Sequence, residues 1–257
     1  MDINLLVVNL GNSRLALGAF VNGNLEFSRR VPIAQRDEFE SAIAEAWSHF
    51  NGAAAEVAGA SVNPGMLEAV EHAVKQATGV GIDWVGENID LPIKVKTDAP
   101  DKTGVDRIVN VAAAYEQMQK ACVVVDAGTA ITIDVCNDAG EFLGGAIAPG
   151  ASLMLLALKQ HTAQLPSVTL AAPEASIGRN TEQAILNGVY YGVRGMVKEV
   201  IENYATELGT WPDLICTGGD AETLFKDWEL VHAISPDLTL YGIALAYTQH
   251  HINSDEG

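Results

Sequence analysis

The sequence is poor in cysteine. It has 3 cysteines in 257 residues, at positions 122, 136 and 216, and no two of them have C-x-x-C spacing. An odd number of cysteines in or beside apolar runs is neither a disulfide framework nor a structural zinc site, so we expect reduced, buried thiols in a cytoplasmic protein. A chain of this length buries enough surface to fold without such cross-links.

Basic residues and long apolar runs are also scarce. The chain has 15 Lys+Arg against 33 Asp+Glu, a net charge of −18, and lacks the basic clusters that nucleic-acid phosphates require. We therefore expect no nucleic-acid partner. No apolar run reaches about 18 residues, and no basic region precedes the first short one, so we expect neither a membrane span nor a secretory signal. A small anionic substrate is still allowed, because backbone N–H groups and a cation can hold it.

Apolar runs alternate with amphipathic segments, which predicts an α/β fold. We expect strands over residues 5–8, 15–20, 57–62, 142–147 and 214–216, and a strand, turn and strand over 122–135. We expect helices over 37–50, 64–77, 104–119, 152–158, 181–208, 221–225 and 240–250. Neither a Walker A motif nor G-x-G-x-x-G occurs, which excludes P-loop and dinucleotide-binding folds of that kind.

An internal repeat is the most informative feature. Val7-Val8-Asn9-Leu10-Gly11-Asn12 aligns with Val124-Val125-Asp126-Ala127-Gly128-Thr129. Each half of the chain thus opens with the same strand, turn and strand. This pattern predicts two duplicated domains, 1–117 and 118–257, with a cleft between them.

The residues of the repeated turn suit phosphate chemistry. A carboxylate at a strand end can hold a cation, glycine allows close approach of the backbone, and Ser, Thr or Asn offers hydrogen-bond donors. An ordinary hairpin turn explains either motif taken alone. The repeat, together with the later strand, Gly218-Gly219 turn and helix that could pack a flat adenine or ribose, favours a nucleotide site.

In chain order, two hairpins and a Gly-Gly turn resemble the acetate and sugar kinase, Hsp70 and actin superfamily. The resemblance implies two actin-like, ribonuclease H-like domains with a nucleotide cleft between them. A narrower resemblance rests on four motifs: Gly104-Val105-Asp106-Arg107, the segments 126–132 and 144–150, and Thr217-Gly218-Gly219-Asp220-Ala221. These motifs, with the family-like segments 161–166 and 178–181, resemble the type III pantothenate kinases over almost the whole chain.

The resemblance implies ATP-dependent phosphorylation of pantothenate to 4'-phosphopantothenate, the first step of coenzyme A biosynthesis, by a homodimer. It implies that Asp106 is the general base and that Asp126 binds a monovalent cation, K⁺ or NH₄⁺. It implies that pantothenate contacts Gly104, Val105, Arg107, His161 and Thr181, with His161 reaching across the dimer interface. It implies that ATP with Mg²⁺ contacts Asn9, Gly11, Asn12, Ser13, Arg14, Gly128, Thr129, Gly218 and Gly219.

Some of these residues have simpler explanations. Asp106 and Arg107 could be ordinary charges at a helix start, His161 a surface or packed side chain, and Thr181 the N-cap of its helix. Two positions depart from the family pattern. Asn9 stands where the family has Asp, with Ser13 in a Thr position, and Thr97 stands where a tyrosine is expected.

The departures leave two interpretations open. The chain is an active pantothenate kinase with a remodelled first turn, or it is a catalytically weak or silent homologue that binds a ligand or regulates. A sugar or acetate kinase fits the hairpins but not the motif Gly104-Val105-Asp106-Arg107. The intact Asp106, Asp126 and Gly-Gly motifs favour the active kinase.

Overall fold

The computed structural model describes residues 3–255, with side chains up to Ile252, and its contacts divide the chain into two compact units. Unit 1 comprises Met1–Lys94, Asp98–Ala113 and Asp237–Gly257, and unit 2 comprises Val95–Thr97 and Ala114–Pro236. The carboxyl-terminal segment belongs to unit 1 because its helix returns to the first sheet. This division differs from the single predicted boundary between residues 117 and 118.

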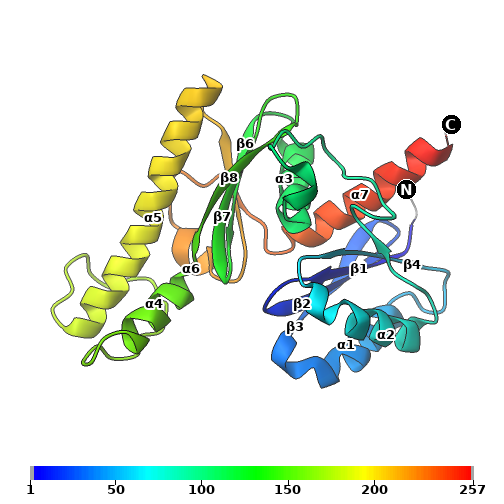
Figure 1. The fold of residues 1–257 in the computed structure, drawn as a ribbon, viewed down its shortest axis with the longest axis horizontal. Coiled ribbons are helices and arrows are strands. Elements are labelled where there is room, and N and C mark those ends of the chain that lie inside the picture. The colour runs from blue at the N-terminus through cyan, green and yellow to red at the C-terminus, as the bar shows by residue number, and fades with distance from the viewer. Residues whose placement is uncertain (1–2, 256–257) are drawn as a thin grey trace. The chain divides into compact units, whose positions relative to one another are not determined.

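Unit 1 is built on a five-stranded mixed sheet with the order β3-β2-β1-β4-β5 (Figure 1). The strands are β1 (Leu5–Leu10), β2 (Arg14–Val21), β3 (Asn24–Pro32), β4 (Glu56–Ser61) and β5 (Asp83–Trp84). The first three are antiparallel, and β1, β4 and β5 are parallel. Its helices are α1 (Phe39–Ser48), α2 (Leu67–Thr78), α7 (Leu238–Asp255), the start of α3 (Val105–Met118), and the 3₁₀ turns Ile33–Glu38, Pro64–Met66 and Pro100–Lys102.

Unit 2 repeats this topology. Its strands are β6 (Cys122–Ala127), β7 (Ala130–Cys136), β8 (Phe142–Pro149), β9 (Asp213–Thr217) and β10 (Ala233–Ile234). Their order, β10-β9-β6-β7-β8, is that of unit 1 read from the other edge, with the same parallel and antiparallel pairs. The helices are α4 (Ala151–Gln160), α5 (Thr181–Leu208) and α6 (Ala221–Phe225). The predicted duplication is therefore confirmed at the level of sheet topology.

The middle strand of each sheet is buried on both faces. Leu6, Val8 and Leu10 of β1 pack in the core beneath α1 and α2, while Leu5 and Val7 pack on the face covered by α7. In unit 2, alternate residues of β6 pack with α4, α5 and α6: Val123, Val125 and Ala127. Burial on both faces explains why the sequences of these strands are continuous apolar runs and do not alternate with polar residues.

The predicted helices and strands are confirmed, and three strands of the described chain were missed. The bounds of α5 and α6 match the predicted helices, and α7 extends beyond the predicted 240–250. Periodicity did not predict β5 and β10, which have two residues each, or β3, whose residues alternate between exposed and half-buried. No helix of residues 3–255 combines the length and apolar character needed to cross a membrane.

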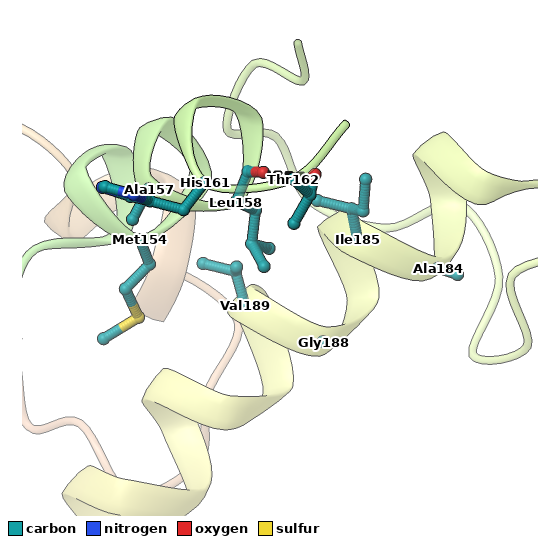
Figure 2. Close-up of a pocket in the computed structure, with 9 residues that line it drawn as sticks. All are labelled: Met154, Ala157, Leu158, His161, Thr162, Ala184, Ile185, Gly188 and Val189. Atoms are coloured by element: carbon teal, nitrogen blue, oxygen red, sulfur yellow. Dashed lines mark hydrogen bonds between the residues drawn. The ribbon is translucent and has the colours of Figure 1, made fainter. Parts of the chain in front are cut away.

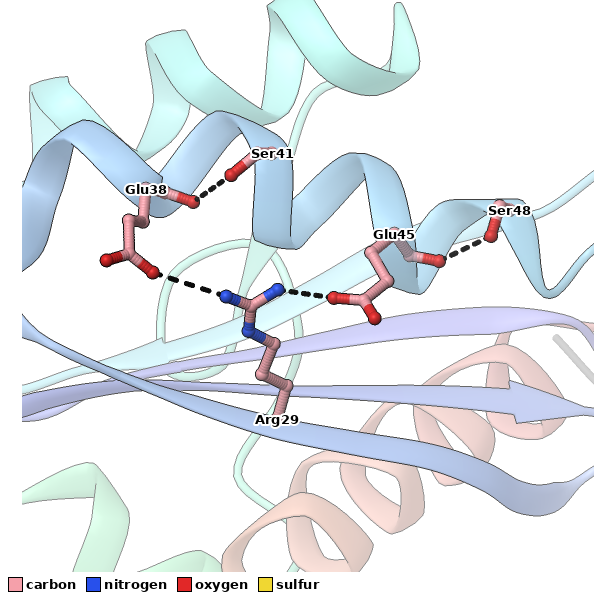
Figure 3. Close-up of polar contacts among 5 residues, drawn as sticks. All are labelled: Arg29, Glu38, Ser41, Glu45 and Ser48. Atoms are coloured by element: carbon pink, nitrogen blue, oxygen red, sulfur yellow. Dashed lines mark hydrogen bonds and ion pairs between the residues drawn. The ribbon is translucent and has the colours of Figure 1, made fainter.

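An ion-pair group ties the edge strand β3 to α1 in unit 1 (Figure 3). The Arg29 guanidinium lies 3.3 Å from Glu38 Oε2 and also pairs with the Glu45 carboxylate. Ser41 and Ser48 donate to the backbone carbonyls of Glu38 and Glu45, one turn back. These side chains are partly exposed, so the ion pairs add at most about 1 kcal/mol each.

We predict that Tyr247→Phe weakens the attachment of α7 to its sheet. Tyr247 is buried, and its hydroxyl donates to the Glu56 carboxylate on β4. Burial and this hydrogen bond raise the pKa of Tyr247, which keeps the hydroxyl protonated as the donor. Loss of the bond should lower the free energy of unfolding by about 1 kcal/mol, measured by urea denaturation with circular dichroism.

Tyr241→Phe is the matched control, because Tyr241 lies on the same helix and is 41% exposed. It should change the free energy of unfolding by less than about 0.5 kcal/mol. Equal losses in both variants would contradict the role assigned to the Tyr247 hydroxyl.

Candidate active site

The first turn of the repeat joins β1 to β2 in unit 1. Gly11 N donates to Arg14 O at 3.0 Å, and Val62 N donates to Leu10 O at 3.1 Å. The Asn63 side chain donates to Gly11 O at 3.3 Å, so the residues after β4 brace this turn. Its remaining predicted phosphate residues are exposed and therefore accessible to a ligand: Asn12, Ser13 and Arg14.

The second turn joins β6 to β7 in unit 2 and has the same framework. Gly128 N donates to Ala130 O, and Asp220 N donates to Ala127 O, both at 3.0 Å. Gly150, the N-cap residue of α4, donates to Thr129 O at 3.0 Å. The side of the turn that carries Thr129 is exposed. The turn is thus held by Asp220, the N-cap residue of α6, and by the start of α4.

The two turns differ by one residue, which corrects the alignment made from the sequence. Residues 11–14 separate the paired Leu10 and Leu15, whereas 128–130 separate Ala127 and Ile131. Ile33 N donates to Ser13 O at 2.9 Å, as Gly150 N does to Thr129 O. Ser13, and not Asn12, is therefore the counterpart of Thr129, and the hydroxyl is present in both turns.

Asp126 lies at the centre of the second turn region. Its register partners are Thr132 on β7 and Thr217 on β9, so a hydroxyl-bearing residue flanks it on each side on the same face of the sheet. Gly218, with φ +94, brings the Gly-Gly turn against it, since a Cβ at 218 would lie 2.4 Å from Asp126 Oδ1. Asp126, Gly128 and Gly218 are thus brought together, with exposed Gly219 beside them.

Asn9 occupies the position in β1 that Asp126 occupies in β6. Both are the residue before the last in a strand buried on both faces. The register partners of Asn9 are Ala16 and Ala60, which carry no hydroxyl. The first turn therefore lacks both the carboxylate and the flanking hydroxyl groups of the second.

Asp106 lies in the first turn of α3, within unit 1. Its Oδ1 accepts a hydrogen bond from Arg107 N at 2.8 Å. Gly104 makes room for this arrangement, because a Cβ at 104 would lie 2.8 Å from the same oxygen. The fourth residue of the motif, Val105, is half-buried at the helix start.

Burial raises the pKa of the Asp106 carboxyl above its ordinary value. The Arg107 backbone hydrogen bond and the Arg107 charge act against this rise. A carboxylate whose proton affinity is raised, and whose orientation is held by its own backbone, suits a group that accepts a proton.

His161 follows the last residue of α4 and lines a cavity of about 590 Å³ between α4 and α5 (Figure 2). The other lining residues are Met154, Ala157, Leu158, Thr162, Ala184, Ile185, Gly188 and Val189. Only His161 and Thr162 contribute polar side chains, and Thr162 Oγ1 donates to Leu158 O at 2.7 Å. The cavity fits a small, largely apolar group with a polar end.

Thr181 is the first residue of α5 and is not its N-cap. The cap is Asn180, whose side chain accepts from Gln183 N at 2.8 Å. The interpretation of Thr181 as an N-cap is therefore wrong. Thr181 is exposed, and the residues that line the cavity on its helix begin one turn later, at Ala184.

The predicted site residues fall into two sets, one in each unit. Unit 1 holds those of the first turn and of the α3 start, and unit 2 holds Asp126, the Gly-Gly turn, His161 and Thr181. The sequence did not point to Asn63, and it pointed to Gly150 and Thr162 only as members of the motif segments 144–150 and 161–166. Thr97, at the expected tyrosine position, lies beside Gly144 on β8. Within the described part of the chain, no cluster of three or more His, Cys, Asp or Glu side chains could hold a metal ion without other ligands.

Comparison with known proteins gives a family. A family model described as type III pantothenate kinase matches residues 5–203. A type III pantothenate kinase of Dehalococcoides mccartyi strain CBDB1 is 34% identical over 254 residues, covering 96% of this chain and 97% of the relative. That of Myxococcus xanthus is 32% identical over 253 residues, covering 96% and 99%.

Solved structures give the fold. The chain is similar to a conserved putative Baf family transcriptional activator from Campylobacter jejuni, with a TM-score of 0.58, 22% identity and coverage of 96% and 99%. It is also similar to MreB5 of Spiroplasma citri bound to AMPPNP, with a TM-score of 0.52, 12% identity and coverage of 100% and 99%. At these identities the likeness concerns the fold alone, and it confirms the predicted actin-like α/β class.

We predict that Gly218→Ala disturbs the turn that carries Asp126. The new Cβ would need φ +94 and would lie 2.5 Å from Ala127 O as well as against Asp126. Strain and crowding together should lower the free energy of unfolding by about 2–4 kcal/mol, measured by thermal and urea denaturation.

Gly209→Ala is the control for backbone strain alone. Gly209 ends α5 at φ +72, and a Cβ there would meet nothing within 4 Å. Gly209→Ala should lower the free energy of unfolding by about 1–2 kcal/mol. If Gly218→Ala lowers the free energy of unfolding by no more than Gly209→Ala does, the turn can move away from Asp126.

Proposed function

The chain belongs to the type III pantothenate kinase family, a family of phosphotransferases, and from that premise we propose that it transfers the γ-phosphoryl group of ATP to the primary hydroxyl of pantothenate. The observation that carries this proposal is the 34% sequence identity to the Dehalococcoides mccartyi type III pantothenate kinase across 96% of this chain. The comparisons give no support to a silent regulatory homologue, since the matching relatives are described as kinases.

In this proposal Asp106 is the general base. The pantothenate hydroxyl loses its proton to Asp106 as its oxygen attacks the γ-phosphorus, and the bond from that phosphorus to the β,γ-bridging oxygen breaks. The hydrogen bond from Arg107 N orients the carboxylate. Burial supports the role, because it raises the pKa of Asp106 toward the operating range of a base.

We assign the ATP phosphates to the two turns and the Gly-Gly segment. Phosphate oxygens would be contacted in unit 1 by Asn9, Gly11 and the exposed donors of the first turn. In unit 2 they would be contacted by Gly128 and Thr129. The nucleoside would lie near Gly218 and Gly219. Mg²⁺ that arrives with ATP would neutralise phosphate charge. It needs few protein ligands, since it keeps several waters and substrate oxygens.

We assign a monovalent cation, K⁺ or NH₄⁺, to Asp126. The donor set supports it, because the carboxylate has Thr132 and Thr217 as its neighbours on the same face. Oxygen donors of this kind suit such a hard cation.

Pantothenate is assigned to Gly104, Val105 and Arg107 in unit 1 and to His161 and Thr181 in unit 2. We propose a cytoplasmic homodimer in which His161 is contributed across the interface. Exposed apolar side chains of unit 2 support an interface there: Ile147, Leu153, Leu156 and Tyr191 are 64%, 44%, 48% and 42% exposed.

A coupled ADP-release assay tests the function. The full chain is supplied with ATP, Mg²⁺ and pantothenate in K⁺, NH₄⁺ or Na⁺ at constant ionic strength, beside acetate and a sugar panel. We expect turnover when pantothenate is the acceptor and none with acetate or the sugars. The rate with pantothenate should be higher in K⁺ or NH₄⁺ than in Na⁺. Turnover with a sugar or acetate, or none with any acceptor, would overturn the proposal, and equal rates in all three salts would overturn the cation assignment.

We predict that Asp106→Asn lowers kcat by about 10²- to 10⁴-fold, because the amide cannot accept the proton. ATP affinity, measured by calorimetry, should stay within about threefold, a difference of less than 1 kcal/mol. In the unmodified protein, kcat/KM should fall on the acid side at a pH above the ordinary aspartate range, since the raised pKa protonates the base earlier.

Asp37→Asn, an exposed change in the same unit, is the matched control and should keep full activity. A near-normal kcat for Asp106→Asn at saturating substrates would show that Asp106 is not the general base. Its charge would then serve only to stabilise the start of α3.

We predict that Asn9→Asp raises kcat/KM for Mg-ATP by up to about 10²-fold, the effect of one electrostatic group on a transition state. The amide and the carboxylate have nearly the same shape, so folding should be unchanged. Asn24→Asp adds the same charge at an exposed position of the same unit and controls for net charge. An equal or lower kcat/KM would mean that this turn has adapted to Asn9.

A further inference from the structure

Two of the three thiols face each other across the β6–β7 hairpin. Cys122 and Cys136 are register partners, both are fully buried, and their Sγ atoms lie 3.3 Å apart in a thiol–thiol hydrogen bond. Cys216 on β9 belongs instead to the core cluster on the α4 and α5 side of the sheet. The phosphotransfer proposed above uses none of these sulfurs.

The separation of the two sulfurs is close to that needed for a covalent bond. A disulfide requires about 2.05 Å between sulfurs, and directly opposite residues of antiparallel strands already hold their Cβ atoms about 4.5–5.5 Å apart. Rotation about the Cα–Cβ bonds and a small shift of one strand would close the gap. The β7–β8 pairing has a register shift next to Cys136, and such a bulge gives this strand end room to adjust.

The pair also has the asymmetry that thiol oxidation needs. Either sulfur can donate in this hydrogen bond. The contact lowers the pKa of the Cys136 thiol, while the contact and burial raise the pKa of Cys122. When Cys136 is ionised, the Cys122 thiol is the donor to it. Only the thiolate is a strong nucleophile.

The pair lies at the end of its strands, close to solvent. Lys120 and Asp138, each two positions away from a cysteine, are exposed. Asp138 Oδ1 accepts from Ala121 N at 2.9 Å, and Tyr115 Oη donates to Asp138 O at 3.0 Å. Local opening of these few contacts would admit a small oxidant without unfolding the sheet.

We propose that Cys122 and Cys136 form a modification site that closes to an intramolecular disulfide when a peroxide oxidises it. The Cys136 thiolate attacks one peroxide oxygen and breaks the O–O bond, which gives Cys136 sulfenic acid and hydroxide. The hydroxide takes up the proton that Cys136 lost on ionising and becomes the first water. The Cys122 sulfur then attacks the Cys136 sulfur, the S–O bond breaks, and water leaves with the Cys122 proton. Two thiols are oxidised and one peroxide is reduced to two waters. A dithiol reductant reverses the reaction.

The disulfide would close a 14-residue separation in sequence at the end of the hairpin opposite the Gly128-Thr129 turn. It would prevent fraying of the strands that carry Asp126. Because a cross-link restricts the unfolded chain, the oxidised protein should have a Tm higher by several degrees than the reduced one.

Intact-mass spectrometry tests the proposal on the full chain. Wild type, Cys216→Ser, Cys122→Ser and Cys136→Ser are treated with hydrogen peroxide, quenched with catalase, unfolded and alkylated. Wild type and Cys216→Ser should lose about 2 Da, the mass of two hydrogens, and two alkylatable thiols, and dithiothreitol should restore both. Cys122→Ser and Cys136→Ser should not lose two hydrogens.

Peptide mapping of oxidised wild type keeps the test independent of variant folding. A linked pair of peptides containing Cys122 and Cys136 is expected. A link to Cys216, or three alkylatable thiols remaining after peroxide exposure that fully oxidises a free cysteine standard, would overturn the proposal. An unchanged Tm after complete oxidation would overturn its structural consequence.

Discussion

Burial of one strand on both faces is the constraint on which each unit depends. In unit 1 the strand is β1, held between the α1–α2 layer and α7, and in unit 2 it is β6. A strand enclosed in this way cannot slip, since a shift of one residue would exchange its two faces. The polar residue just before its end, Asn9 or Asp126, is therefore held at a fixed position next to a glycine turn.

Much of this could be predicted, and the failures have physical causes. The apolar runs of β1 and β6, the periodicity of α5 and the glycine motif before Asp106 are local signals. The repeat was aligned without a gap, which paired Asn12 with Thr129, although the family resemblance already placed Ser13 in a Thr position. The cap of α5 fell on Asn180 beside Thr181, since either side chain can accept from the helix. The α4–α5 cavity depends on tertiary packing alone.

Duplication has left two halves with different chemistry. Asp126 has Thr132 and Thr217 as neighbours, whereas Asn9 has Ala16 and Ala60. All three positions are thus less polar in unit 1 than in unit 2. Ala60 is buried and Ala16 is half-buried, so of these three residues in unit 1 Asn9 alone has a polar side chain. The two turns therefore differ in the polar groups that lie beside them.

The return of α7 to unit 1 has a consequence for biosynthesis. The face of β1 that carries Leu5 and Val7 is covered by Leu240, Ile243 and Tyr247, which the ribosome adds only after all of unit 2. Unit 2, apart from its short strap Val95–Thr97, is one continuous segment and can fold as it emerges. Although unit 1 is translated first, α3 alone can pack on this face before unit 2 is made, so part of the apolar surface of unit 1 stays exposed until α7 leaves the ribosome.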